Sequence, residues 1–195
     1  SARLGEPDPT VLSMLSMFLG SSDTRDVLGA LVGIVVLYMG KADQEVYNLI
    51  FPLLSSSDNN VCLFAIYVLG CVFPGDMAIL SSCLDVYEQL QKETVFSNFA
   101  ILGIALFFYK IRFDVDLEAE CEEAAPTHEP SSIYAEQFRR LDKHARILAL
   151  GFANIGTGNP AVIDQIFSRA FVGEIDALLE SVGLLSCCLI AIGDT

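Results

Sequence analysis

Short runs of small and aliphatic residues return along the chain at nearly constant spacing. The runs are GIVVLYMG ending at Gly40, LGCVFPG ending at Gly75, GIALFFYK ending at Lys110, ALGFANIG ending at Gly156 and SCCLIAIG ending at Gly193. The spacings between successive end points are 35, 35, 46 and 37 residues. A unit of about 35 residues therefore recurs, with about 11 residues inserted once. This period is long enough for two helices and two turns.

The polar positions divide the predicted helices into two kinds. Inner helices are apolar on nearly every side, whereas outer helices carry one apolar and one polar side at helical spacing. The predicted inner helices span residues 25–39, 61–73, 96–109 and 174–192, and the outer helices span residues 43–54, 78–91, 114–124 and 161–171. A first helix runs from Pro9 to about Leu19 with Asp8 as its N-cap. Residues 133–152 form one long helix or two short ones.

A helix pair of this size cannot bury its own apolar face, so neighbouring pairs must stack into one core. We therefore expect an all-α fold with a single solenoid-like repeat domain over residues 1–195. The sequence stops where a further helix should begin, which suggests a piece of a longer protein. Residues 125–132 (APTHEPSS) contain two prolines and are predicted to be a mobile surface loop. Small residues of the first inner helix, Gly29, Ala30 and Gly33, would allow neighbouring backbones to approach closely.

The composition raises the question of a membrane protein, because 53% of residues are hydrophobic and the mean hydropathy is +0.51. No charge-free run reaches the roughly 18 to 20 residues that a spanning helix needs. The loops show no flanking Lys/Arg clusters that would set an orientation. We therefore interpret the apolar helices as buried in protein and keep a small polytopic membrane protein as an alternative.

The charge of the chain indicates what kind of partner it has. A formal net charge of −14 and a pI near 4.3 argue against nucleic acid and favour partners with a basic face. Half of this charge lies in residues 114–129, where seven acidic side chains occur without one Lys or Arg. This segment is a solvated helix face or an interaction surface. The chain also has one basic cluster, which we interpret mainly as compensating the charge of this acidic segment. It consists of Arg139, Arg140, Lys143 and Arg146.

Nothing in the sequence assembles a catalytic or metal site, so we expect no enzyme activity and no cofactor. The two histidines, His128 and His144, lack the spacing of a metal set and are interpreted as solvated. No nucleophile stands in a GxSxG context. Free, buried thiols in a reducing compartment are expected, because four of the cysteines lie inside apolar runs, no CxxC pair occurs, and the chain is much larger than a small disulfide-stabilised domain. The six cysteines are Cys62, Cys71, Cys83, Cys121, Cys187 and Cys188.

Acidic positions on the predicted outer helices are the better candidates for function. Asp85, Glu88 and Gln89 share one face at i, i+3 and i+4, and Asp76 begins the same helix, which predicts a compact negative patch. Asp76 has an alternative role, because a negative residue at a helix start complements the macrodipole. Equivalent faces of stacked outer helices would form an acidic strip. The candidate binding residues are Asp43, Glu45, Asn48, Asp76, Asp85, Glu88, Gln89, Asp114, Asp116 and Glu118.

Two long segments and one turn carry a family resemblance that covers nearly the whole chain. The segments DVLGALVGIVVLYMGKADQEVYNLIFPLL and ARILALGFANIGTGNPAVIDQIF, with the turn Gly75-Asp76, resemble the proteasome/cyclosome repeats of the larger non-ATPase scaffold subunits of the proteasome regulatory particle. Of these, the chain is more similar to the subunit that docks ubiquitin-like domains. The resemblance implies a closed toroid of helical hairpins, of which this chain is an arc, without enzymatic activity. It also implies a location in the cytoplasm and nucleus.

The resemblance implies the following partners: ubiquitin, ubiquitin-like domains of shuttle factors, a proteasome-associated deubiquitinase, and other regulatory particle subunits such as the ATPase ring. Nucleic acid and membrane are not expected partners. Acidic residues on outer helices receive the ubiquitin fold in that family. Matched by motif, they fall on Asp76 and near Asp85 and Glu88 or Gln89, whereas a gap-free register places the last two on Cys83 and Tyr87. The alternative is a repeat adaptor of another assembly, such as the cyclosome.

Overall fold

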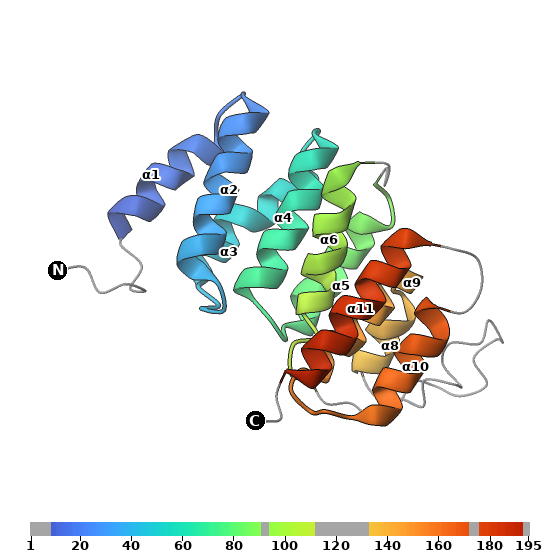
Figure 1. Ribbon diagram of the computed structural model, residues 1–195. Helices are drawn as coiled ribbons and strands as arrows, with labels where there is room; N and C mark the ends of the chain where they lie inside the picture. The colour runs from blue at the N-terminus through green and yellow to red at the C-terminus, as the bar shows by residue number, and fades with distance from the viewer. Residues whose placement is uncertain (1–8, 91–93, 112–132, 172–175, 193–195) are drawn as a thin grey trace. The chain divides into compact units, whose positions relative to one another are not determined.

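The computed structural model describes residues 9–90, 94–111, 133–171 and 176–192, and these are helical almost throughout (Figure 1). This part of the chain contains ten α-helices, one short 3-10 helix and no strand. The all-α helical-repeat fold predicted from the sequence is confirmed. The elements are α1 (Pro9–Leu19), α2 (Thr24–Tyr38), α3 (Gln44–Ile50), η1 (Phe51–Ser55), α4 (Asn59–Val72), α5 (Met77–Tyr87), α6 (Val95–Leu106), α8 (Ile133–Arg139), α9 (Lys143–Ala153), α10 (Pro160–Ala170) and α11 (Ala177–Ala191).

The helices lie where they were predicted, but some boundaries differ: α5 ends at Tyr87 rather than at residue 91, and α6 ends at Leu106 rather than at residue 109. Of the two alternatives predicted for residues 133–152, the structure has the two short helices, α8 and α9. The predicted outer helix 43–54 changes to the 3-10 form at η1, because Pro52 has no N–H to continue the α-helical ladder. The last inner helix begins at Ala177, after the N-cap Asp176. The predicted helix 114–124 and the predicted loop 125–132 lie outside the described residues.

The chain divides into two compact units, residues 1–107 and 108–195. In the first unit α1 packs on α2, α2 on α4, and α4 on α6, so the inner helices follow one another side by side (Figure 1). In the second unit both α9 and α10 pack against α11. The side chains between these helices are almost all apolar; α4 alone buries eleven of its residues. The single repeat domain expected over the whole chain stays a prediction.

The turns that define the sequence repeat also bond to the carboxyl-terminal ends of inner helices. Each turn donates a backbone N–H to one of the last carbonyl groups of the next inner helix. Because the last four carbonyls of a helix have no intrahelical donor, these bonds satisfy groups that would otherwise be unpaired. The four bonds run from Gly40 to Cys71 (2.9 Å), from Gly75 to Phe107 (3.0 Å), from Lys110 to Phe152 (3.1 Å) and from Gly156 to Leu189 (3.1 Å).

Inner helices approach each other most closely at glycines other than the expected ones. A Cβ on Gly70 of α4 would collide with the carbonyl oxygen of Gly103 in α6, so these two backbones touch. By contrast, a Cβ on Gly29 would meet nothing within 4 Å, and one on Gly33 would meet only the side chain of Leu15. The expectation of close backbone approach was right for inner helices but wrong for Gly29 and Gly33.

Aspartate N-caps begin most of the capped helices, and in one place such a cap ties two inner helices together. The Asp58 side chain accepts the backbone N–H of Asn60 at the start of α4. It also accepts the Thr24 hydroxyl from the first turn of α2, at 2.7 Å. This bond joins the amino-terminal ends of α2 and α4, whereas Gly40 joins their carboxyl-terminal ends.

Asp58 is expected to make the stability of the first unit dependent on acid pH. The Thr24 hydroxyl, together with backbone N–H groups, holds the pKa of Asp58 below its ordinary value of 3.8. A carboxylate with a lowered folded-state pKa stabilises the fold above the unfolded-state pKa, and this contribution is lost as the pH falls through the folded-state pKa. We therefore expect the free energy of unfolding to decrease as the pH is lowered below about 4.

The measurement is urea denaturation of the wild type and of Asp58→Asn at neutral pH and at acid pH. Asparagine is an equally good N-cap that does not titrate. The variant should therefore lose less stability on acidification than the wild type does. An identical pH dependence of the two proteins would show that Asp58 is not the group responsible.

Candidate protein-binding surface

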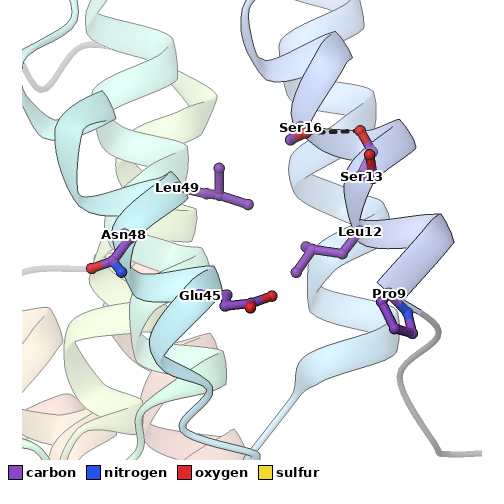
Figure 2. Close-up of a pocket in the computed structure, with 7 residues that line it drawn as sticks. All are labelled: Pro9, Leu12, Ser13, Ser16, Glu45, Asn48 and Leu49. Atoms are coloured by element: carbon purple, nitrogen blue, oxygen red, sulfur yellow. Dashed lines mark hydrogen bonds between the residues drawn. The ribbon is translucent and has the colours of Figure 1, made fainter.

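A groove lies between α1 and α3, and it contains two of the predicted binding residues (Figure 2). Its volume is about 360 Å³. Figure 2 shows Glu45 and Leu49 pointing from α3 toward Leu12 on α1. The groove thus places one carboxylate beside two leucines. The lining residues are Pro9, Leu12, Ser13, Ser16, Glu45, Asn48 and Leu49.

The N-cap Asp43 fixes how α3 presents this surface. Its carboxylate accepts the backbone N–H of Glu45 at 2.8 Å and that of Val46 at 3.2 Å. Val46 is fully buried, which orients the helix, and Glu45 and Asn48 are exposed one turn apart on the other side. Asp43 therefore has a structural role and contributes to the groove through α3 rather than by direct lining.

The acidic residues of α5 lie at the two ends of that helix. Asp76 is the N-cap and accepts the N–H groups of Ala78 and Ile79, both at 3.1 Å. Asp85 and Glu88 are in the last turn and at the C-cap, and both are exposed. Nine residues of α-helix separate Asp76 from Asp85 by about 13 Å along the axis. The single compact patch predicted from the sequence was therefore wrong.

The position of each acidic residue on its helix indicates why it is there. A negative charge at a helix start is stabilised by the macrodipole and by capping, so stability alone accounts for Asp43 and Asp76. At the end of a helix the macrodipole disfavours a negative charge. The macrodipole therefore does not account for Asp85 and Glu88 at the end of α5.

The two registers implied by the family resemblance differ in how exposed their residues on α5 are, and which of them makes the contacts stays a prediction. The gap-free register places two contact residues on Cys83 and Tyr87, whose side chains are 0% and 4% exposed. Neither can meet a partner. Asp85, Glu88 and Gln89 are exposed, and the Gln89 amide donates to the Asp85 carbonyl at 2.9 Å. Of the two registers, only the shifted one gives accessible residues on α5.

The remaining predicted contacts, Asp114, Asp116 and Glu118, lie outside the described residues, so the acidic strip across three helices stays a prediction. Sequence reasoning missed the contribution of α1 to the groove. The signal was present, because Leu12, Ser13 and Ser16 recur at i, i+1 and i+4 and therefore lie on one side of a helix. The sequence pattern did not show, however, that this side of α1 faces α3.

The cysteine side chains and His144 lie in different environments. Cys62, Cys71 and Cys83 are buried free thiols, as predicted, and burial raises the pKa of Cys71 to about 11. In the described part of the chain no group of three His, Cys, Asp or Glu side chains could hold a metal ion. His144 is not simply solvated as expected. It is 26% exposed, and its Nε2 atom lies 3.2 Å from Asp176 Oδ2.

Fold and surface together define the class of this chain: a helical-repeat protein that presents a partly apolar, acidic surface on its outer helices. Across the described residues, no helix has the length and apolar character needed to span a bilayer. No family model matches the sequence.

Comparison with curated proteins gives relatives that are named as regulatory subunits of the 26S proteasome. The chain is 37% identical over 193 residues to the 26S proteasome regulatory subunit RPN1 of Encephalitozoon cuniculi, which covers 97% of the chain and 22% of that protein. It is 25% identical over 195 residues to the 26S proteasome non-ATPase regulatory subunit 2 of Dictyostelium discoideum, which covers 97% of the chain and 20% of that protein. The chain thus spans about a fifth of the length of these relatives. The resemblance inferred from the sequence is confirmed: the chain is related over nearly its whole length to a segment of the proteasome's non-ATPase regulatory subunits.

Proposed function

We propose that this chain is part of a non-catalytic scaffold of the proteasome regulatory particle, and that its outer helices bind ubiquitin and the ubiquitin-like domains of shuttle factors. The names of the relatives, regulatory and non-ATPase subunits, support the scaffold role. Other regulatory particle subunits would then be its permanent neighbours, in the cytoplasm and nucleus. The observation that carries the binding role is the groove between α1 and α3.

The groove has the chemistry that a ubiquitin-like fold requires. Such folds present an apolar sheet face ringed by Lys and Arg, so the receptor needs an apolar contact beside a negative charge. Leu49 supplies the apolar contact, and Glu45 supplies the charge. Because the carboxylate is exposed, its attraction is screened by salt. Binding is therefore expected to be weak and to weaken further as the ionic strength rises.

The proposal is tested by heteronuclear NMR, titrating the isotope-labelled chain with unlabelled ubiquitin. We expect amide shifts at the groove, in Ser13, Glu45 and Asn48, and at the end of α5, in Asp85 and Glu88. Shifts confined to residues remote from α1, α3 and α5, or no shifts at all, would contradict the proposal.

Charge reversal then identifies the residues responsible. Glu45→Arg, and separately Asp85→Arg with Glu88→Arg, are each expected to raise the Kd for ubiquitin about tenfold, because each replaces an attraction with a repulsion. Asp164→Arg on α10 is the matched control, since Asp164 is also exposed but lies on neither surface. Asp76 is tested only as Asp76→Asn, which keeps the N-cap and removes the charge. Equal Kd values for the reversed variants and the control would exclude an acidic receptor.

A further inference from the structure

His144 lies between two carboxylates at the start of α9. Its Nε2 atom is 3.2 Å from Asp176 Oδ2, and its Nδ1 atom is 4.0 Å from Asp142 Oδ1. Asp142 is the N-cap of α9 itself, whereas Asp176 is the N-cap of α11, the next inner helix. The His144 side chain is 26% exposed, so water reaches the ring without surrounding it. This histidine therefore bridges the amino-terminal ends of two inner helices.

The two carboxylate oxygens of Asp176 have separate roles. Oδ1 accepts the backbone N–H groups of Leu178 at 3.1 Å and of Leu179 at 3.0 Å, which caps α11. Oδ2 is the atom that faces His144. The Leu179 N–H, with a smaller contribution from His144, holds the pKa of Asp176 below its ordinary value of 3.8. The Asp176 carboxylate is therefore charged throughout the pH range in which histidines titrate.

The number of protons on the imidazole decides how many of these contacts are favourable. A neutral imidazole carries one N–H group, so it can donate to one carboxylate only, and the lone pair of its other nitrogen faces the second carboxylate. An imidazolium donates from both nitrogens, and a hydrogen bond between two charged groups is stronger than a neutral one. Histidine side chains ordinarily titrate between about pH 5 and pH 8. The contact between the starts of α9 and α11 should therefore strengthen as the pH falls through this range.

The first unit has the same kind of contact without a histidine. There the Thr24 hydroxyl, in the first turn of α2, donates to Asp58, the N-cap of the next inner helix, at 2.7 Å. Thr24 and His144 both lie in the first turn of an inner helix, and each contacts the aspartate that begins the following one. A hydroxyl does not titrate between about pH 5 and pH 8, and the pKa of Asp58 lies below 3.8. The contact in the first unit is therefore constant over this range.

The rest of the α9–α11 contact is held by groups that do not titrate. The Gly156 N–H donates to the Leu189 carbonyl at 3.1 Å, and the Ser186 hydroxyl donates to the Ile147 carbonyl at 3.0 Å. Ser186 is 0% exposed, whereas Leu178 in the first turn of α11 is 41% exposed. Local opening is therefore easier at the amino-terminal end of α11 than around Ser186.

The other charged side chains near α9 keep their charge between about pH 5 and pH 8, because they are carboxylates, lysines and arginines. Those on α9 and on the described elements that contact it are Lys110, Glu136, Arg139, Arg140, Lys143, Arg146, Asp164, Arg169 and Glu180. The thiols of α11, at Cys187 and Cys188, lie near the opposite end of that helix. A change in this contact between these pH values therefore points to His144.

We propose that His144, with Asp142 and Asp176, forms a pH-dependent switch in the second unit. Protonation of the imidazole tightens the contact between the starts of α9 and α11, and loss of the proton allows the first turns of α11 to open locally. Because the folded contact binds this proton more readily than the unfolded chain does, the stability of this end falls as the pH rises. The direction is opposite to that expected for Asp58, whose contribution is lost in acid.

The test is hydrogen exchange of the full chain, followed by NMR at about pH 7.5 and about pH 5.5, on either side of the ordinary histidine titration. Each exchange rate is divided by the intrinsic rate of that amide at the same pH. We expect the amides of residues 180–182 to be about threefold more protected at the lower pH, which is the effect of a partly exposed ion pair. The amides of residues 62–64 stand at the same positions after Asp58 and should keep their protection.

Two variants identify the groups responsible. His144→Gln keeps a side chain that can donate to Asp176 but cannot take up a proton, and Asp176→Asn keeps an N-cap without the charge. Each variant should abolish the pH dependence in α11 and leave α4 unaltered, with circular dichroism confirming that the helices remain folded. Three results would overturn the proposal: wild-type protection in α11 that does not rise at the lower pH, an equal rise in α4, or a rise that persists in His144→Gln.

Discussion

Gly70→Ala is expected to lower the free energy of unfolding of the first unit by about 3 kcal/mol or more, and to be among the most damaging single-methyl additions in this chain. The new Cβ would occupy the position of the Gly103 carbonyl oxygen. This oxygen belongs to the backbone of α6, so it cannot rotate away as a side chain would. The two helices would have to separate, and the apolar contacts on both sides of the collision would be lost.

Gly29→Ala is the matched control, because it makes the same substitution in the inner helix α2. A Cβ there would meet nothing within 4 Å, so the better helix propensity of alanine is the main effect. The control should gain about 0.5 to 1 kcal/mol. Urea denaturation followed by circular dichroism measures both changes. Two glycines that respond alike would show that the α4–α6 backbone contact is not as close as the structure has it.

This pair of glycines also shows where the sequence stops being informative. The starts and ends of the helices were predictable, because an acidic N-cap or a glycine in the left-handed conformation is a local signal. Gly40 and Gly75 have φ angles of 71° and 89°, and each ends one of the runs that define the sequence repeat. Gly29 and Gly70 look alike in the sequence, since each lies within an apolar inner helix. Which of them touches a backbone depends on where the next helix packs, and this is a non-local property.

For the candidate surface, too, the local features were predictable from the sequence and the non-local ones were not. Exposed carboxylates on α3 and α5 were found from the alternation of polar and apolar positions, which is a property of each helix alone. The functions of those carboxylates were not found in this way. Asp76 and Asp85 belong to one helix and one residue type, yet the first caps the helix and the second lies where the macrodipole opposes it. The groove was missed because its two sides, α1 and α3, come from different hairpins.

In the second unit, Gly151→Ala is expected to lower the free energy of unfolding by about 2 to 3 kcal/mol. The added Cβ would lie 2.7 Å from the Cβ of Ser186 and 2.8 Å from its Cα atom. Ser186 is 0% exposed, and its hydroxyl donates to the Ile147 carbonyl at 3.0 Å, so the side chain has a fixed position on α9. Unlike Gly70, Gly151 faces a group that a second substitution can remove.

Ser186→Gly should therefore rescue part of the loss. The single variant Ser186→Gly loses a buried hydrogen bond and helix propensity, which costs about 1 to 2 kcal/mol. The double variant should be more stable than the sum of the two single effects predicts, by at least about 0.5 kcal/mol, because the collision is relieved. It should remain less stable than the wild type, since the Cα atom of residue 186 still lies within 2.8 Å. Hydrogen exchange can assign these changes to α9 and α11; strictly additive effects would mean that the two residues do not touch.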